Sequence, residues 1–118
     1  MLAVTSAFLL ALLAPAALAA DNHSVTLTIK DDSFTPSTLT VPADTRIEIE
    51  IHNTRALPSE FESFDLNREK VVPGGTTLSL WIGPLAPGKY KFFDDFNPGV
   101  TGVIVVEKPG NKTPNKTP

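Results

Sequence analysis

Residues 46–52 read Arg-Ile-Glu-Ile-Glu-Ile-His, and this strict alternation of apolar and polar side chains decides the fold class. Neighbouring side chains of a β-strand point to opposite faces, so the three isoleucines are expected in a core and the charged residues in solvent. Residues 24–30 and 76–82 repeat the pattern, and no window of ten residues carries the 3.6-residue apolar period of a helix. The alternation therefore predicts an all-β protein, a Greek-key β-sandwich of seven or eight strands.

Proline and glycine separate these predicted strands, with 11 Pro and 7 Gly in 118 residues. Residues 85–90, Leu-Ala-Pro-Gly-Lys-Tyr, are typical of a tyrosine corner, in which the phenol ties a crossover to its own strand in Greek-key folds. The sole tyrosine, Tyr90, is therefore predicted to be structural rather than catalytic. The run Val103-Ile104-Val105-Val106 predicts a buried strand near the C-terminus.

The composition excludes several kinds of chemistry. The chain has no cysteine, so it can form no disulfide, thiolate metal site or cysteine nucleophile. Its net charge is −3 with scattered basic residues, which argues against nucleic acid as a partner. The only methionine is Met1. Function is therefore expected to rest on oxygen and nitrogen chemistry.

The N-terminus has the composition of an export signal. Residues 1–20 carry no charged side chain, and Ala17-Leu18-Ala19 fits the small-x-small pattern that precedes signal-peptidase cleavage. We expect a signal peptide over residues 1–19, a domain over residues 20–108 and a disordered tail over residues 109–118, in a periplasmic protein. An N-terminal membrane anchor is the alternative for the leader.

The order of the motifs resembles the cupredoxins. Phe34-Thr35-Pro36, residues 39–43 and a strand that ends in Asn53 resemble their N-terminal half, and residues 90–93 with residues 102–106 resemble their last loop and strand. Matched by spacing, the four copper ligands of that family (His, Cys, His and Met) fall on Ser59, Asp94, Asn97 and Val100. A blue-copper centre needs a thiolate. Electron transfer by a type-1 copper site is therefore excluded.

A narrower resemblance concerns residues 57–63, Leu66, residues 69–74 and residues 92–96, which look like FtrB and EfeO-type cupredoxins. That resemblance implies a periplasmic subunit of a bacterial ferrous-iron uptake system, handling iron and optionally copper, beside an Ftr-type iron permease. Oxidation of Fe(II) needs an electron acceptor, and the sequence has neither a thiolate for a copper site nor a cofactor motif. The protein is therefore not expected to be an enzyme alone, although assistance with Fe(II) oxidation stays open.

Two acidic segments form the candidate site. We predict metal ligands at Glu60, Glu62, Glu69, Asp94 and Asp95, because hard oxygen donors suit Fe²⁺ or Fe³⁺, Mn²⁺ and Ca²⁺ better than Cu(I). The alternative is an ordinary charged surface. By strand parity Ser59 and Phe61 point inward and the glutamates at 60 and 62 outward, which would keep them from meeting inward carboxylates.

The remaining candidates have less support. Phe92, Phe93 and Phe96 flank the second acidic segment, and two of them are expected in the core. His23 falls beside the expected cleavage point in a segment expected to be mobile, where it would bind Cu²⁺ only as the third residue of a free terminus. His52 is the last residue of the strand 46–52 and lies on its polar face.

The alternative function for the whole protein is a docking module that binds no metal and positions a membrane partner.

Overall fold

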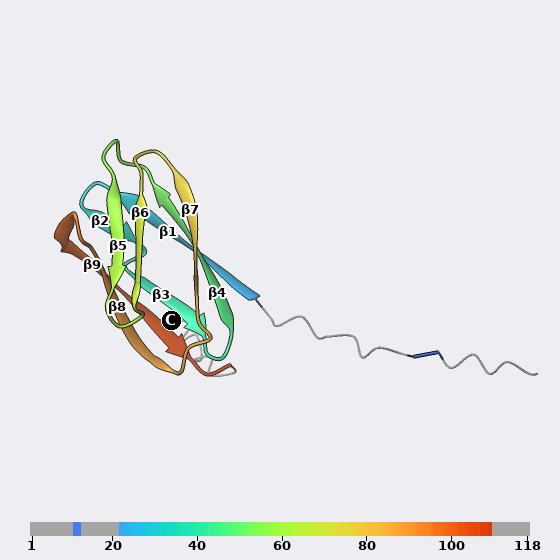
Figure 1. Ribbon diagram of the computed structural model, residues 1–118. Coiled ribbons are helices and arrows are strands. Elements are labelled where there is room, and N and C mark those ends of the chain that lie inside the picture. The colour runs from blue at the N-terminus through green and yellow to red at the C-terminus, as the bar shows by residue number, and fades with distance from the viewer. Residues whose placement is uncertain (1–10, 13–21, 110–118) are drawn as a thin grey trace, which may run out of the picture.

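The computed structural model describes residues 11–12 and 22–109 of the chain, and within them the regular structure is entirely β (Figure 1). Two sheets pack as a sandwich, which confirms the predicted fold class. The strands are β1 (Asn22–Lys30), β2 (Ser33–Thr35), β3 (Thr38–Pro42), β4 (Arg46–Asn53), β5 (Ser59–Ser63), β6 (Arg68–Val72), β7 (Thr77–Ile82), β8 (Gly88–Asp94) and β9 (Asn97–Glu107).

The described residues form nine strands rather than the seven or eight expected from the sequence. The three-residue strand β2 is too short to show an alternation of its own. The edge strand β6 leaves four of its five residues exposed, so it presents no regular apolar face. Periodicity in the sequence therefore does not identify very short strands or exposed edge strands.

Strand order explains why distant segments become neighbours. The four-stranded sheet runs β2-β1-β4-β7, and the five-stranded sheet runs β3-β9-β8-β5-β6. β1 pairs with β4 and β3 pairs with β9 in parallel, and the other pairs are antiparallel. This crossover order is that of a Greek key. It places β5, which carries one acidic segment, between β6 and the end of β8, which carries the other.

The core lies between the two sheets and is built by the alternating positions. Ile47, Ile49 and Ile51 of β4 are buried, as predicted. From the five-stranded sheet, Phe92 stacks on Phe61 at a centroid distance of 5.0 Å. Burying side chains of this size contributes roughly 1.5–3 kcal/mol each. The aromatic and aliphatic layers together hold the two sheets face to face.

Two expectations about buried residues need correction. In the strand that ends the domain, Ile104 and Val106 are buried but the valines between them, at 103 and 105, are only half-buried, because one face of β9 points outward. Of the three phenylalanines near the second acidic segment, Phe92 alone is in the core. Phe93 lies on the outward face of β8, and Phe96 is 53% exposed in the turn that follows.

The predicted tyrosine corner is present. The hydroxyl of Tyr90 donates a hydrogen bond to the carbonyl of Ala86 at 2.8 Å, which ties β8 to the crossover that precedes it. The predicted signal peptide lies outside the described residues except for Ala11 and Leu12, which have no regular structure. Most of the predicted tail lies outside them as well. No helix in the described part of the chain is long and apolar enough to cross a membrane.

Candidate metal centre

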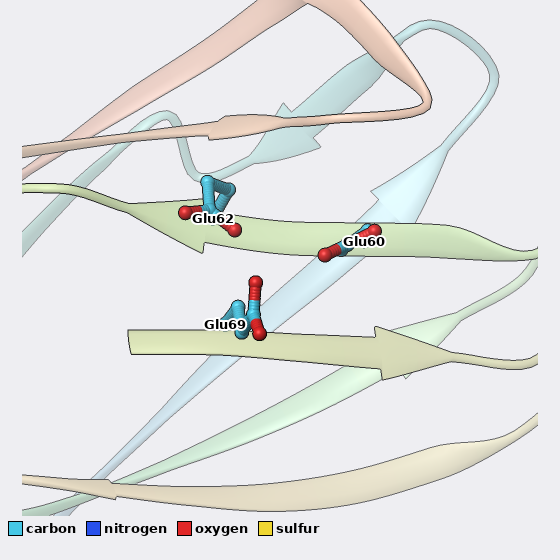
Figure 2. A group of neighbouring side chains, drawn as sticks. All are labelled: Glu60, Glu62 and Glu69. Atoms are coloured by element: carbon cyan, nitrogen blue, oxygen red, sulfur yellow. The ribbon is translucent and has the colours of Figure 1, made fainter. Parts of the chain in front are cut away.

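Three of the five predicted ligands come together on the β5–β6 hairpin. Glu62 of β5 lies directly opposite Glu69 of β6, and Glu60 follows two residues away on the same face of β5. One carboxylate oxygen of each lies within 4.8 Å of the others. Figure 2 shows the side chains of Glu62 and Glu69 beside each other on neighbouring strands. The hairpin thus gathers three oxygen donors within the span of a single cation.

Strand parity decides which way these side chains point. In β5 the burial alternates, with Ser59, Phe61 and Ser63 buried and the two glutamates half-buried on the other face. The outward parity expected from the sequence is therefore correct. The cluster sits on the outer face of the five-stranded sheet, open to solvent and to ions, rather than inside the sandwich.

The carboxylates repel one another in this arrangement. Desolvation raises the pKa of Glu60, and the negative charges of Asp95, Glu69 and Asp94 raise it further. Desolvation also raises the pKa of Glu62, followed by the charge of Glu69 and a hydrogen bond with it. A cation between the carboxylates would remove this repulsion and favour their ionised forms.

Basic side chains of the described chain do not neutralise this cluster. Within the described residues the ion pairs closer than 4.0 Å join His52 to Glu50 and Arg55 to Asp94, and neither involves the three glutamates. Hard oxygen donors in such a set suit Fe²⁺ or Fe³⁺, Mn²⁺ and Ca²⁺. The arrangement can therefore hold a hard cation, and it supplies no sulfur or imidazole ligand.

Asp94 does not join this group. Its side chain is fully buried on the inward face of β8, while the glutamates point outward. One of its oxygens accepts hydrogen bonds from the backbone N–H groups of Glu60 and Phe96, each at 3.0 Å. The other accepts from the Ser59 hydroxyl and lies 3.7 Å from Nη1 of Arg55. Each oxygen of this carboxylate is thus engaged by the protein itself.

Asp95, in the second acidic segment, contacts the backbone of the first. Its side chain is exposed, and its backbone N–H donates to the carbonyl of Glu60 at 2.9 Å. It lies outside the close group of three, but its charge is the largest electrostatic contribution to the raised pKa of Glu60. Asp95 therefore adds to the negative potential beside the cluster.

The positions expected for copper ligands do not fit copper. The two positions matched to the first His and the Cys, Ser59 and Asp94, hydrogen-bond to each other. Asn97 donates through Nδ2 to Asp32 at 3.1 Å, and Val100 is buried and apolar. Internal hydrogen bonds and an aliphatic side chain thus occupy the four positions, and no soft donor is among them.

The histidines are engaged in the four-stranded sheet. His23 lies in β1 and pairs in register with Ile47 of β4, so the expectation of a mobile segment is wrong at this residue. His52 contacts the Glu50 carboxylate through Nε2 at 2.5 Å and Thr77 through Nδ1 at 3.3 Å. Neither residue belongs to the carboxylate group that the structure brings together.

Sequence reasoning missed Arg55, whose guanidinium approaches the buried Asp94. It lies in the loop between β4 and β5, and no periodic pattern indicates where a loop side chain points. The sequence did indicate that the Ser59 side chain points inward, and a buried hydroxyl needs a hydrogen-bond partner nearby. Asn53, the last residue of β4 before this loop, donates to the carbonyls of Leu57 and Val72.

The strand order and the packing of the two sheets place the protein among the Greek-key β-sandwiches, the architecture expected of a cupredoxin-like protein. The comparison with protein families agrees, because the model of the cupredoxin-like domain matches residues 2–106. The chain belongs to that family.

The comparison with curated proteins found an uncharacterized protein of Rickettsia prowazekii (strain Madrid E) that is 43% identical over 83 residues. The match covers 70% of this chain and 66% of that protein, slightly less than two thirds of its length. A relative without a described function adds no chemistry to this family assignment.

Solved structures of low sequence identity share the fold. Auracyanin A, a blue copper protein of Chloroflexus aurantiacus, matches with a TM-score of 0.63 at 15% identity, covering 74% of this chain and 100% of that one. The metal-binding domain of the Cu(I)-exporting ATPase of Streptococcus pneumoniae D39, solved with Cu(I), matches with a TM-score of 0.62 at 16% identity over 72% and 85%. A purple cupredoxin of Nitrosopumilus maritimus matches with a TM-score of 0.56 at 18% identity over 70% and 98%. Likeness at this level of identity concerns the fold, not the ligands.

Proposed function

We propose that this protein is a periplasmic metal-binding subunit of a bacterial ferrous-iron uptake system, of the FtrB/EfeO type, which carries iron as cargo and acts with an Ftr-type iron permease. The observation that carries the proposal is the group of Glu60, Glu62 and Glu69, whose oxygens lie within 4.8 Å on an open sheet face. The resemblance of residues 57–63 and 69–74 to that type of cupredoxin supplies the transport context.

The donor set supports a hard ion as the cargo. Carboxylates without thiolate or imidazole favour Fe²⁺, Fe³⁺ or Mn²⁺ over Cu(I). The raised pKa values of Glu60 and Glu62 add a driving force, because a bound cation relieves the repulsion between the carboxylates. Copper is the second candidate, since a blue copper protein and a metal-binding domain solved with Cu(I) share this fold.

An exposed carrier site suits transfer between proteins. The cluster lies on the sheet surface, so a partner can approach the ion without opening the sandwich. Three ligands leave further coordination positions free for water or for the groups of an acceptor. Iron would therefore be held loosely enough to be passed to a permease.

The test is metal titration of variants that are matched in shape. Isothermal titration of the purified protein with Fe²⁺ under anaerobic conditions, and with Fe³⁺, Mn²⁺ and Cu²⁺, measures affinity and stoichiometry. We expect one hard ion per chain, with binding lost or weakened at least tenfold in Glu62→Gln, because that variant removes one charged ligand.

Asp94→Asn is the matched control. It removes an equal charge on the inward face and keeps the shape of the side chain, so we expect unchanged metal binding. If Asp94→Asn loses metal binding while Glu62→Gln keeps it, the metal site would be at the buried Asp94 and not at the surface cluster. Absence of binding for all four ions would contradict the proposed function and favour a docking module without metal. The exposed Phe64 and Phe96 would then be the candidate contacts with the partner.

A further inference from the structure

A groove of about 660 Å³ crosses the outer face of the five-stranded sheet beside the carboxylate cluster. Two exposed lysines of β8, Lys89 and Lys91, line it together with hydroxyl side chains of β3 and β9 and with apolar groups. Phe93 belongs to both features, because it lines the groove and pairs in register with Glu62. Groove and cluster are therefore parts of one continuous surface.

Charge is separated along this surface. Glu62 and Glu69 lie level with Phe93, whereas Lys91 and Lys89 are two and four residues away along β8. At 3.3 Å per residue the lysines lie about 7 and 13 Å below the level of the acidic pair. Lys89 is therefore too far from the acidic pair to form an ion pair with it. Among the described residues, the ammonium groups of Lys89 and Lys91 do not lie within 4.0 Å of any carboxylate.

Aromatic side chains occupy the space between the two charged groups. Phe64, in the turn after β5, is 77% exposed, and its ring lies 5.3 Å from that of Phe93. Phe64 is exposed and Phe93 is half-buried, and an exposed aromatic ring has an unfavourable contact with water. Aromatic residues are enriched at protein interfaces. The face thus runs from the acidic cluster through the aromatic pair to the two lysines, beside which the Asp65 carboxylate accepts from the backbone N–H of Lys91 at 2.8 Å.

We infer that this face pairs with the same face of a second copy of the chain in a two-fold dimer. In such an isologous contact, residue i meets residue j and j meets i, so a face with one acidic end and one basic end is complementary to itself. The lysines of each copy lie against the three glutamates of the other, and Phe64 lies near the axis, where it enters the groove. The contact supplies the cations that the cluster lacks among the described residues of its own chain.

The size of the face sets the expected strength. Five strands spaced about 4.8 Å apart span about 24 Å, and the seven residues of β8 span about 23 Å, which gives roughly 550 Å² of flat area. Stable interfaces bury about 800 Å² per partner. The face is smaller than a standard stable interface, so we expect a weak dimer.

This inference goes beyond the proposed function and is independent of iron. A metal ion and a second copy compete for the same carboxylates, so dimerisation is measured on metal-free protein in the presence of a chelator. If metal binds but the protein stays monomeric, the dimer inference fails alone. If the protein dimerises but takes no metal, the proposed function fails alone.

The experiment is sedimentation velocity from about 10 µM to about 1 mM, concentrations at which a weak dimer forms. We expect a rise in the weight-average sedimentation coefficient from monomer towards dimer, and a weaker dimer in 0.5 M salt, where the Debye length is only about 4 Å. A monomer throughout the range overturns the inference.

Charge reversal identifies the face. Lys91→Glu and Glu62→Lys each place like charges in the contact, so each weakens the dimer at least tenfold. The combined variant Glu62→Lys/Lys91→Glu exchanges the two charges within one chain and restores the dimer. Lys30→Glu, on β1 of the other sheet, makes the same change of charge and leaves the dimer intact. Equal weakening by the β1 variant, or no recovery in the combined variant, overturns the pairing of these faces.

Discussion

At the scale of single residues, two acidic side chains on neighbouring strands have opposite roles because they point to opposite faces. Asp94 faces inward, where backbone N–H groups, the Ser59 hydroxyl and Arg55 surround its carboxylate. Glu62 faces outward, where its neighbours are other carboxylates. The first carboxylate stabilises the junction of β5 with the β8–β9 turn, whereas the second destabilises the folded protein unless a cation binds.

The pH dependence of stability follows from the raised pKa values. For Glu60 and Glu62 the pKa in the folded protein lies above the ordinary value of 4.5. Between pH 4.5 and the raised pKa of the folded protein, the folded protein binds more protons than the unfolded chain. The protonated carboxyls therefore contribute their full stability below pH 4.5, and this contribution is lost as the pH rises through the raised pKa.

We therefore predict that Glu62→Gln, in metal-free protein, melts at a higher temperature than the wild type at neutral pH. The difference should vanish near pH 4, where both carboxyls are protonated, and grow upward through the window that begins at about 4.5. Thermal denaturation followed by circular dichroism measures it. The control is Glu107→Gln at the far end of β9. A difference in melting temperature that is constant with pH would show that repulsion within the cluster is not the cause.

At the scale of elements, the β8–β9 hairpin is held by an exact fit of an aromatic ring against a glycine. Phe92 and Gly102 are register partners on the inward face of the sheet. A Cβ at Gly102 would lie 2.2 Å from Cζ of Phe92, far inside van der Waals contact. The ring cannot easily retreat, because Phe34 packs edge-on against it at 4.9 Å and Phe61 stacks on it at 5.0 Å.

We predict that Gly102→Ala lowers the free energy of unfolding by about 1–3 kcal/mol, the usual cost of overpacking a core. Gly99→Ala, three residues earlier on the same strand, is the matched control, because no atom lies within 4 Å of its added methyl group. Urea denaturation measures both variants. Equal stability of the two would mean that the hairpin shifts to accept the methyl group, and the aromatic stack would then not fix its position.

At the scale of the whole molecule, the two sheets share one core and depend on each other. Ile49 and Ile51 of the four-stranded sheet, and Phe92 and Ile104 of the five-stranded sheet, are all buried in a single cluster. Neither sheet can separate without exposing that cluster to water, at a cost of roughly 25 cal/mol for each Å² of apolar surface. The loop between β4 and β5 adds the Arg55–Asp94 contact between them.

The sandwich should therefore unfold as one cooperative unit. Trp81, the sole tryptophan, lies on β7 of the four-stranded sheet, where Arg46 packs over its ring at 4.4 Å. We predict that its fluorescence and the far-ultraviolet circular dichroism of the whole chain change at the same urea concentration, as in a two-state transition. Two separate midpoints would show that the sheets unfold independently.

The sequence alone determined the fold class, the inward isoleucines of residues 46–52, the tyrosine corner at Tyr90 and the outward direction of Glu60 and Glu62. Each of these follows from local rules, because a strand alternates with a period of two and a turn depends on a few adjacent residues. The absence of cysteine likewise excluded a blue-copper centre without a structure.

The tertiary structure decided which carboxylates meet. Glu62 and Glu69 are partners because the β5–β6 turn fixes the register of the hairpin, and a shift of one residue would have sent their side chains to opposite faces. Asp94 turned inward to meet Ser59 and Arg55, a loop residue that no periodicity could place. Contacts between distant segments depend on strand order and register, which are set by packing over the whole sandwich and are not written in any short stretch of sequence.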